Sequence, residues 1–413
     1  MRSEFGSPAF WAAKLPDPDR LLLSPEGIDR LNNGIRNSFL SIADPLALDA
    51  RSSAEIEAAI TGCGGLPDEA WCRGEALSPE EREALRASLD LGKVRAFSGN
   101  CYGITVRRAD LRALPTRRAI HEAATGYDEI DLLQHCALDP ATPLAILHES
   151  RDGQWLFCIA PFYAGWLHRN DVALCDSPGT LGQALEHGRS LIVTASWHPL
   201  AVDGEEVLFQ MGARIPCEGG AADAPALLLP RRGADGALQW RRIASAGSGN
   251  GLSPGFLPFT QANVLEQAFK MLDEPYAWGD SCGGRRGRDC SRLVQDIFKT
   301  MGVILPRNGG QQASCLSTVL EFPSGEDFPT RLARLQALGS PLCLLRMPGH
   351  ILLHLGQEKG MSYAFHSLWS YGGDFANRTI VSPLDMGIGT ESGPILLRMS
   401  RTVGWTDRLA GYI

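Results

Sequence analysis

The chain has 413 residues, of which 44% are hydrophobic and 21% charged, a composition typical of a globular protein with roughly two to four domains. Its formal net charge of −8 and the lack of a basic run argue against binding to nucleic acid or to an anionic membrane surface. No segment approaches the roughly eighteen consecutive apolar residues that a membrane span requires.

The N-terminal region, residues 1–85, is predicted to form short helices joined by irregular segments. Its first seven residues, MRSEFGS, match what stacked cloning-site sequences encode in frame, so we interpret them as a vector scar replacing a native leader, which favours an exported protein. Further on, SPEGIDRLNNGIRN and SPEEREALRASLD each begin with a serine N-cap followed by proline at the first helical position. We expect this region to clasp other domains without taking part in chemistry.

The eleven cysteines are scattered along the chain and do not form the framework of a disulfide-rich protein. Cys63 and Cys72 are nevertheless close enough in sequence to pair. The cysteine and histidine spacings do not indicate a zinc site.

Two stretches, residues 86–177 and 178–255, are rich in short β-type runs. In the first, a DG-x-W…GW-x-x-x-x-x-V pattern and polar turns predict a small barrel. In the second, SLIVTASWHPLAV and LQWRRIAS are strand-like, so we predict a second and weaker copy. The glycine-rich AGSGNGLSPG, residues 246–255, is interpreted as the linker to the last domain.

A cysteine at the start of an amphipathic helix dominates the last part of the chain, residues 256–413. Apolar residues recur at three- and four-residue spacing over 293–301, with Asp289 as the N-cap and Gly302 as the stop. Cys290 therefore lies in the first helical turn, where the helix dipole and the unpaired N–H groups favour an anion. We expect its pKa to be lowered and its thiolate to be accessible.

Histidines at the start of one strand and on the next supply a base and its partner. His350 opens the apolar run of PGHILLHLG, and His366 lies in YAFHSLWSYG on the following strand. We expect His350 to act on the Cys290 sulfur, and His366 to hold the far nitrogen of His350 in one tautomer. His354, on the same strand, is interpreted as a structural histidine.

Four motifs in order, PYAWG, RDCSRLVQ, LPRNGGQQ and GHILLHLG, resemble the NlpC/P60 family of cell-wall peptidases over roughly residues 256–400. The resemblance implies that Cys290 is the nucleophile, His350 the base and His366 the third polar residue. It also implies that Tyr276 is a hydroxyl donor to the oxyanion. Residues that it implies for substrate binding are Trp278, Asp289 and Ser291.

The chain departs from the family pattern at three places. Arg292 follows the Asp-Cys-Ser motif, where the family usually has glycine. Gly309 replaces a polar residue that often follows the Pro-Arg pair, and the loop GDSCGGRRG is about two residues long for the family. The interval between His350 and His366 is also long.

The DG-x-W…GW pattern resembles bacterial SH3-like domains. SH3-like domains followed by NlpC/P60 are typical of γ-D-glutamyl-diamino acid endopeptidases that act on murein stem peptides with a free N-terminal L-Ala. The resemblance implies that a tyrosine and an acidic residue of the first barrel meet the substrate's α-ammonium group together with Asp289. By spacing, the candidates are Tyr163 and one of Asp128 and Glu129.

The sequence therefore predicts an α+β multidomain protein. It has a helical N-terminal clasp (1–85), two small SH3-like β-barrels (86–177 and 178–255) and a papain-like catalytic domain (256–413). We expect a monomeric cysteine peptidase without a cofactor, whose partner is the murein stem peptide L-Ala-γ-D-Glu-diaminopimelate. The alternatives are an amidase or acyltransferase on another amide, and a wall-binding protein with an inactive catalytic domain. We expect it in the cell envelope or periplasm, with cytoplasmic recycling of wall fragments as the alternative.

Overall fold

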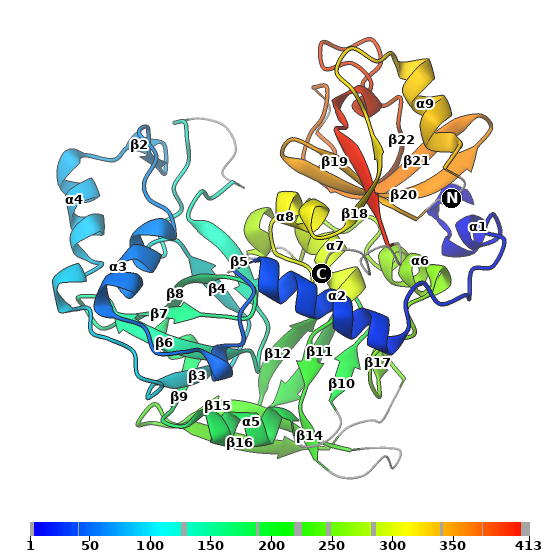
Figure 1. The fold of residues 1–413 in the computed structure, drawn as a ribbon. Helices are drawn as coiled ribbons and strands as arrows, with labels where there is room; N and C mark the ends of the chain where they lie inside the picture. Colours follow the sequence, from blue (N-terminus) through cyan, green and yellow to red (C-terminus); the bar gives the residue numbers. More distant parts are fainter. Residues whose placement is uncertain are drawn as a thin grey trace.

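The computed structural model describes residues 4–39, 41–124, 130–186, 190–218, 225–244, 249–281, 286–338, 342–373 and 375–405 (Figure 1). Serine caps begin three of the N-terminal helices, because the side chains of Ser24, Ser52 and Ser78 each accept a hydrogen bond from a backbone N–H of the first turn. The helices of this region are α1 (Pro8–Ala12), α2 (Pro25–Ser38), α3 (Ser53–Gly62) and α4 (Pro79–Ala87).

The first β region, residues 102–175, is one seven-stranded antiparallel sheet in the order β5-β4-β8-β7-β6-β3-β9. Helices α3 and α4 cover its apolar side, where Ile60 and Leu85 share a core with Phe157 and Trp166 (Figure 1). Its strands are β3 (Tyr102–Thr105), β4 (Ala109–Arg112), β5 (Gln134–Leu138), β6 (Pro143–Glu149), β7 (Trp155–Ile159), β8 (Ala164–His168) and β9 (Val172–Cys175).

The second β region, residues 191–253, follows helix α5 (Pro178–Glu186) and comprises three small sheets. Its core contains Val193, Phe209 and Leu229. The strands are β10 (Leu191–Val193), β11 (Trp197–Val202), β12 (Glu205–Gln210), β13 (Arg214–Ile215), β14 (Cys217–Glu218), β15 (Ala226–Arg232), β16 (Leu238–Ile243) and β17 (Leu252–Ser253).

The C-terminal region, residues 261–404, packs helices against a six-stranded sheet in the order β18-β23-β19-β20-β21-β22. Helix α7 is buried along most of its length, and Leu293, Ile297 and Phe298 are fully buried in the core. The helices are α6 (Gln261–Phe269), α7 (Cys290–Lys299), α8 (Gly309–Ser314) and α9 (Phe328–Gln336). The strands are β18 (Ser317–Glu321), β19 (Leu344–Met347), β20 (His350–Glu358), β21 (Met361–Leu368), β22 (Arg378–Pro383) and β23 (Arg401–Gly404). These regions together confirm the mixed helix-and-sheet, multidomain class.

The N-terminal segment contacts the C-terminal region as well as the first sheet. Trp11 of α1 is fully buried against the C-terminal region, and Phe5 stacks on Tyr363 with 5.0 Å between ring centroids. Asn32 of α2 donates to the carbonyl of Gly302 at 2.8 Å and accepts from the N–H of Ile304 at 2.8 Å. Helix α2 therefore caps the loop after α7, and lies across the junction of the regions (Figure 1).

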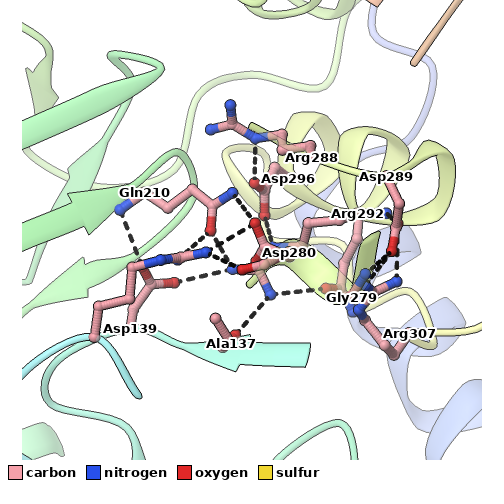
Figure 2. A network of polar contacts seen from close by, with 12 residues as sticks. Ala137, Asp139, Gln210, Gly279, Asp280, Arg288, Asp289, Arg292, Asp296 and Arg307 are labelled. Carbon is pink, nitrogen blue, oxygen red and sulfur yellow. Dashed lines mark hydrogen bonds and ion pairs between the residues drawn. The ribbon is translucent and has the colours of Figure 1, made fainter. Parts of the chain in front are cut away.

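Arg292, in the first turn of α7, carries a buried guanidinium that joins the C-terminal region to both β regions (Figure 2). Its Nη2 donates to Gln210 Oε1 at 2.9 Å and lies 3.2 Å from Asp139 Oδ2. Its Nε lies 2.8 Å from Asp296 Oδ1 and 3.1 Å from Asp280 Oδ2. Because a buried charge is tolerated only when it is paired, these carboxylates hold the three regions in one arrangement.

A second buried arginine strengthens the same junction. Arg288 Nε donates to Asp296 Oδ2 at 2.8 Å, and its Nη2 donates to the carbonyl of Ser196 in the second β region at 2.7 Å (Figure 2). Its guanidinium also pairs with Glu274 and stacks 4.8 Å from the ring centroid of Trp197. The segment before α7 is therefore fixed to the second β region.

We predict that Arg292→Met destabilises the protein by about 3–5 kcal/mol, because it leaves several buried carboxylates without their cation. Urea denaturation followed by tryptophan fluorescence measures the change. The matched control is Arg86→Met, which removes an exposed arginine paired only with Glu83 on α4, and should not shift the midpoint. Equal midpoints for the two variants would contradict the role of Arg292 at the junction.

Candidate active site

Helix α7 places Cys290 at its first position, with Asp289 as the N-cap. The Asp289 carboxylate accepts the N–H of Arg292 at 2.9 Å, as an N-cap side chain should. The Cys290 thiol is half-buried and accepts hydrogen bonds from the backbone N–H groups of Ile351 and Ser291. The sulfur therefore lies between the start of α7 and the start of β20, where Ile351 directly follows His350.

The electrostatics of Cys290 differ from the sequence-based expectation. Burial raises the pKa of the thiol to about 12, and the negative charge of Asp289 adds to this effect. The hydrogen bonds from Ile351 and Ser291, and the charge of Arg307, lower the pKa by less. The expectation of a lowered pKa was wrong, because the desolvation of the sulfur outweighs the helix dipole.

His350 and His366 lie together on neighbouring strands β20 and β21. His350 Nε2 is 2.8 Å from His366 Nδ1, and His366 Nε2 is 2.8 Å from the hydroxyl of Ser382 on β22. Burial lowers the pKa of His350 to about 4 and that of His366 well below its usual value, so both rings are neutral at pH 7. With His350 Nε2–H donating to His366, the Nδ1 of His350 keeps a free lone pair.

Tyr276 is buried close to Cys290. Burial raises the pKa of its phenol, and the charges of Asp289 and Cys290 raise it further. The hydroxyl therefore stays protonated at neutral pH and remains a hydrogen-bond donor. Together with backbone N–H groups at the start of α7, it can stabilise an anion that forms next to the sulfur.

Sequence reasoning did not predict the roles of Ser382 or Arg307. Ser382 is located only by the pairing of β21 with β22, which no local signal reveals. Arg307 stands in the LPRNGGQQ motif, and its Nη1 lies 3.1 Å from Asp289 Oδ1 and 2.7 Å from Ser291 Oγ. The motif could have indicated it, because an arginine following a buried apolar segment needs a carboxylate partner.

Residues 273–326 match the NlpC/P60 family, and residues 118–168 match an SH3 domain of the SH3b1 type. The chain contains an NlpC/P60 domain and an SH3b domain. The matches are local and cover the segment around Cys290 and most of the first sheet.

The NlpC/P60 architecture extends beyond these segments. A solved structure described as an NlpC/P60 endopeptidase from Photobacterium damselae subsp. piscicida has a TM-score of 0.71 and 18% identity, over 94% of this chain and 93% of that one. An NlpC/P60 family protein from Bacillus cereus has a TM-score of 0.48 and 13% identity, over 74% of this chain and 99% of that one. At such identities, the first likeness shows the fold alone.

One curated relative matches a short part of the chain. The bifunctional muramidase/DL-endopeptidase CwlT of Bacillus subtilis is 40% identical over 58 residues, which are 14% of this chain and 17% of that protein. The chain thus spans less than a fifth of the length of this relative.

The residues predicted to bind substrate in the NlpC/P60 domain lie around the Asp289 carboxylate. Asp289 accepts the N–H of Gly279 at 3.1 Å and the Ser291 hydroxyl at 3.1 Å, and it pairs with Arg307 (Figure 2). Trp278 opens the short helix η5 (Trp278–Asp280), and its buried indole N–H has no partner among the described residues. Asp289 is thus already neutralised by a cation.

The SH3b domain packs directly against the short helix η5. Gly279 has a φ of +60°, and a Cβ there would come within 2.4 Å of Gln134 Cγ on β5. Tyr163, between β7 and β8, is half-buried. Its ring packs at a tilt against His135, with 4.6 Å between ring centroids, and the charge of Arg307 lowers its pKa slightly against the rise caused by burial. Asp128 and Glu129 lie outside the described residues.

Cys63 and Cys72 do not pair. Both are free thiols, and the Cys63 sulfur lies 3.3 Å from His135 Nε2 and 3.1 Å from the carbonyl of Ala164. The pairing that their closeness in sequence allowed is not made, because the Cys63 sulfur contacts His135 and strand β8 instead.

In the parts of the chain that the structure describes, no three His, Cys, Asp or Glu side chains lie together as a metal site would need. No described helix combines the length and apolar character needed to cross a membrane.

We predict that alkylation of Cys290 by iodoacetamide is slow at pH 7 and rises with pH without a plateau below about pH 9, because its pKa of about 12 keeps the thiol protonated. Peptide mass spectrometry after timed quenching measures the rate at this residue, with the exposed-loop peptides of the same digest as internal standards. A rate that is already maximal at pH 7 would show a resting thiolate instead.

Proposed function

We propose that the protein is a cysteine endopeptidase that hydrolyses the γ-D-Glu–diaminopimelate bond of murein stem peptides with a free N-terminal L-Ala. The observation that carries the proposal is the relay His350–His366–Ser382 on strands β20, β21 and β22, in an NlpC/P60 domain where β20 and β21 pack against the helix that Cys290 begins. The curated relative is described as a DL-endopeptidase in part, which agrees with this choice of reaction. The same chemistry assigns the cell wall as its site of action.

The reaction begins with the Cys290 thiol and the His350 imidazole both uncharged. His350 takes the Cys290 proton through the free lone pair of Nδ1 as the sulfur attacks the γ-carbonyl carbon, so the thiolate forms only during the attack. The Tyr276 hydroxyl and the backbone N–H of Cys290 stabilise the tetrahedral oxyanion. The imidazolium of His350, supported by His366 and Ser382, then gives its proton to the departing amine.

The second half of the reaction removes the acyl group. Water enters after the amine has left, and His350 again accepts a proton as the water attacks the thioester. The tetrahedral intermediate collapses and returns the thiol of Cys290. The products are L-Ala-γ-D-Glu and a peptide or amino acid with a free diaminopimelate amine.

Selectivity for a free N-terminus is proposed to come from the wall formed by the SH3b domain. Tyr163 lies in this domain within range of the Arg307 charge, and Asp289 accepts the N–H of Gly279 in η5, but Arg307 already neutralises the Asp289 carboxylate. The substrate's ammonium therefore needs a further carboxylate, which we assign to Asp128 or Glu129. An N-acylated stem peptide would leave that carboxylate unpaired and is disfavoured.

We predict cleavage of L-Ala-γ-D-Glu-meso-diaminopimelate but not of the same peptide N-acetylated, measured by mass spectrometry of the products. Cys290→Ala should abolish turnover, because it removes the nucleophile, whereas Cys315→Ala in the same domain should retain it. Turnover by Cys290→Ala would contradict the mechanism. Equal cleavage of both peptides would keep the peptidase and remove the ammonium selectivity.

We predict that kcat/KM falls only as the pH drops through about 4, because the base His350 becomes protonated there rather than at its usual value of about 6.5. The pKa is lowered, so the active neutral form persists to lower pH. Steady-state rates from pH 3.5 to 8, with circular dichroism at each pH to exclude unfolding, measure the profile. An acid limb centred near pH 6.5 would contradict a buried, neutral base.

A further inference from the structure

A row of charged residues crosses the sheet next to the catalytic residues. Arg401 of β23 lies opposite Glu321 of β18 on one side and opposite Arg346 of β19 on the other. Arg346 in turn lies opposite Ile351 of β20. Directly opposed residues share a face of a sheet, and Ile351 is buried under the start of α8, so the row runs along the face that carries α7 and α8.

The row forms the floor of a cavity of about 480 Å³. Helix α8 forms one wall of it with Gly310 and Ser314. The charged lining consists of Arg346, Arg401 and Glu321. The turn before His350 contributes Pro348, which places the cavity beside the catalytic base.

The two arginines of this cavity lack acidic partners. Arg401 Nη2 reaches only the Ser314 hydroxyl at 3.3 Å, and Arg346 Nη1 lies 3.5 Å from the carbonyl of His350. Neither forms an ion pair with a described residue, whereas Arg288, Arg292 and Arg307 all do. Like charges directly opposite each other on neighbouring strands are destabilising, and a bound anion would offset this cost.

The cavity lies where the leaving group must be. His350 gives its proton to the departing amine, so the amino acid that carries this amine lies against His350 during the reaction. Arg346 faces Ile351, whose N–H meets the Cys290 sulfur, and its guanidinium touches the His350 carbonyl. The substituents of the departing amino acid are therefore within reach of the arginine pair.

We propose that Arg346 and Arg401 bind a free carboxylate of the amino acid released with the amine, an inference that rests on the proposed function. Glu321, on the same row, accepts an ammonium group next to that carboxylate. Carboxylate and ammonium together are the free amino-acid end of the diaminopimelate side chain, whereas a lysine side chain ends in an ammonium alone. The cavity thus selects diaminopimelate over lysine at the leaving position.

The test compares three peptides that differ only in the leaving residue: L-Ala-γ-D-Glu followed by meso-diaminopimelate, by meso-diaminopimelate with its main-chain carboxyl amidated, or by L-Lys. We expect kcat/KM for both diaminopimelate peptides to exceed that for the lysine peptide by about 10- to 100-fold, the range of one or two charge-assisted hydrogen bonds. Arg401→Gln and Arg346→Gln should each reduce this ratio about tenfold. The matched control is Arg398→Gln, an exposed arginine of the same domain outside the cavity, which should leave the ratio unchanged.

The ratio separates recognition from any general effect of the arginines on Cys290 or His350, since such an effect changes all three rates alike. The carboxylate site would be overturned if the arginine variants lowered kcat/KM equally for all three peptides. It would also be overturned if the unmodified protein did not prefer diaminopimelate to lysine. A rate for the amidated diaminopimelate peptide below that for the lysine peptide would assign the arginines to the main-chain carboxylate, which both unamidated peptides carry, and would overturn the selection of diaminopimelate.

Binding to Cys290→Ala distinguishes this inference from the proposed function. If no peptide is cleaved by the unmodified protein but calorimetry shows tighter binding of the diaminopimelate peptide that Arg401→Gln removes, the carboxylate site stands and the proposed reaction falls. If Arg401→Gln does not weaken binding of the diaminopimelate peptide, the carboxylate site is wrong, whether or not the protein cleaves the peptide.

Discussion

The pairing of one buried guanidinium fixes the arrangement on which the rest of the structure depends. Arg292 stands two positions after the nucleophile, and its charge is balanced by carboxylates and an amide from three separate regions. Burial alone would raise the pKa of Asp280, but Arg108 and Arg292 hold it below its usual value. Removing either the guanidinium or its carboxylate partners would leave buried charges unpaired. The helix that carries Cys290 therefore cannot shift without breaking the junction.

This constraint positions the SH3b domain as well as the junction. The SH3b domain contacts the NlpC/P60 domain at η5, where Gly279 admits Gln134 at a distance that a side chain would not allow. The same segment supplies the N–H that holds Asp289. The SH3b domain is thus held against η5 by packing and by the charge network.

The catalytic groups combine burial with neutrality. The thiol and both imidazoles are uncharged in the resting state, so the site avoids the cost of a buried ion pair. In the proposed reaction, charge develops only as the sulfur attacks, where the Tyr276 hydroxyl and the N–H of Ile351 already lie close. Such an arrangement favours the transition state over the resting state.

Local patterns predicted the parts of the site that depend on neighbouring residues. The N-cap Asp289, the helix after Cys290 and the strand after His350 follow from residue order, and the structure has all three. Ser382, Arg307 and the pKa of Cys290 depend on strand pairing and burial, which the sequence does not encode locally. Arg292 stands where the NlpC/P60 family usually has glycine. The arginine is explained by a partner, Gln210, that lies more than 80 positions away in sequence and that no local pattern reveals.

The N-terminal contacts have a consequence for biosynthesis. Lys14 pairs with Glu358, 344 positions later, and Trp11 lies in the core that includes α7 and β20. During synthesis, the first helix therefore emerges long before its binding surface exists, and its tryptophan stays exposed until the final sheet is translated. The core around the helix that Cys290 begins is therefore complete only after strand β20 has been synthesised.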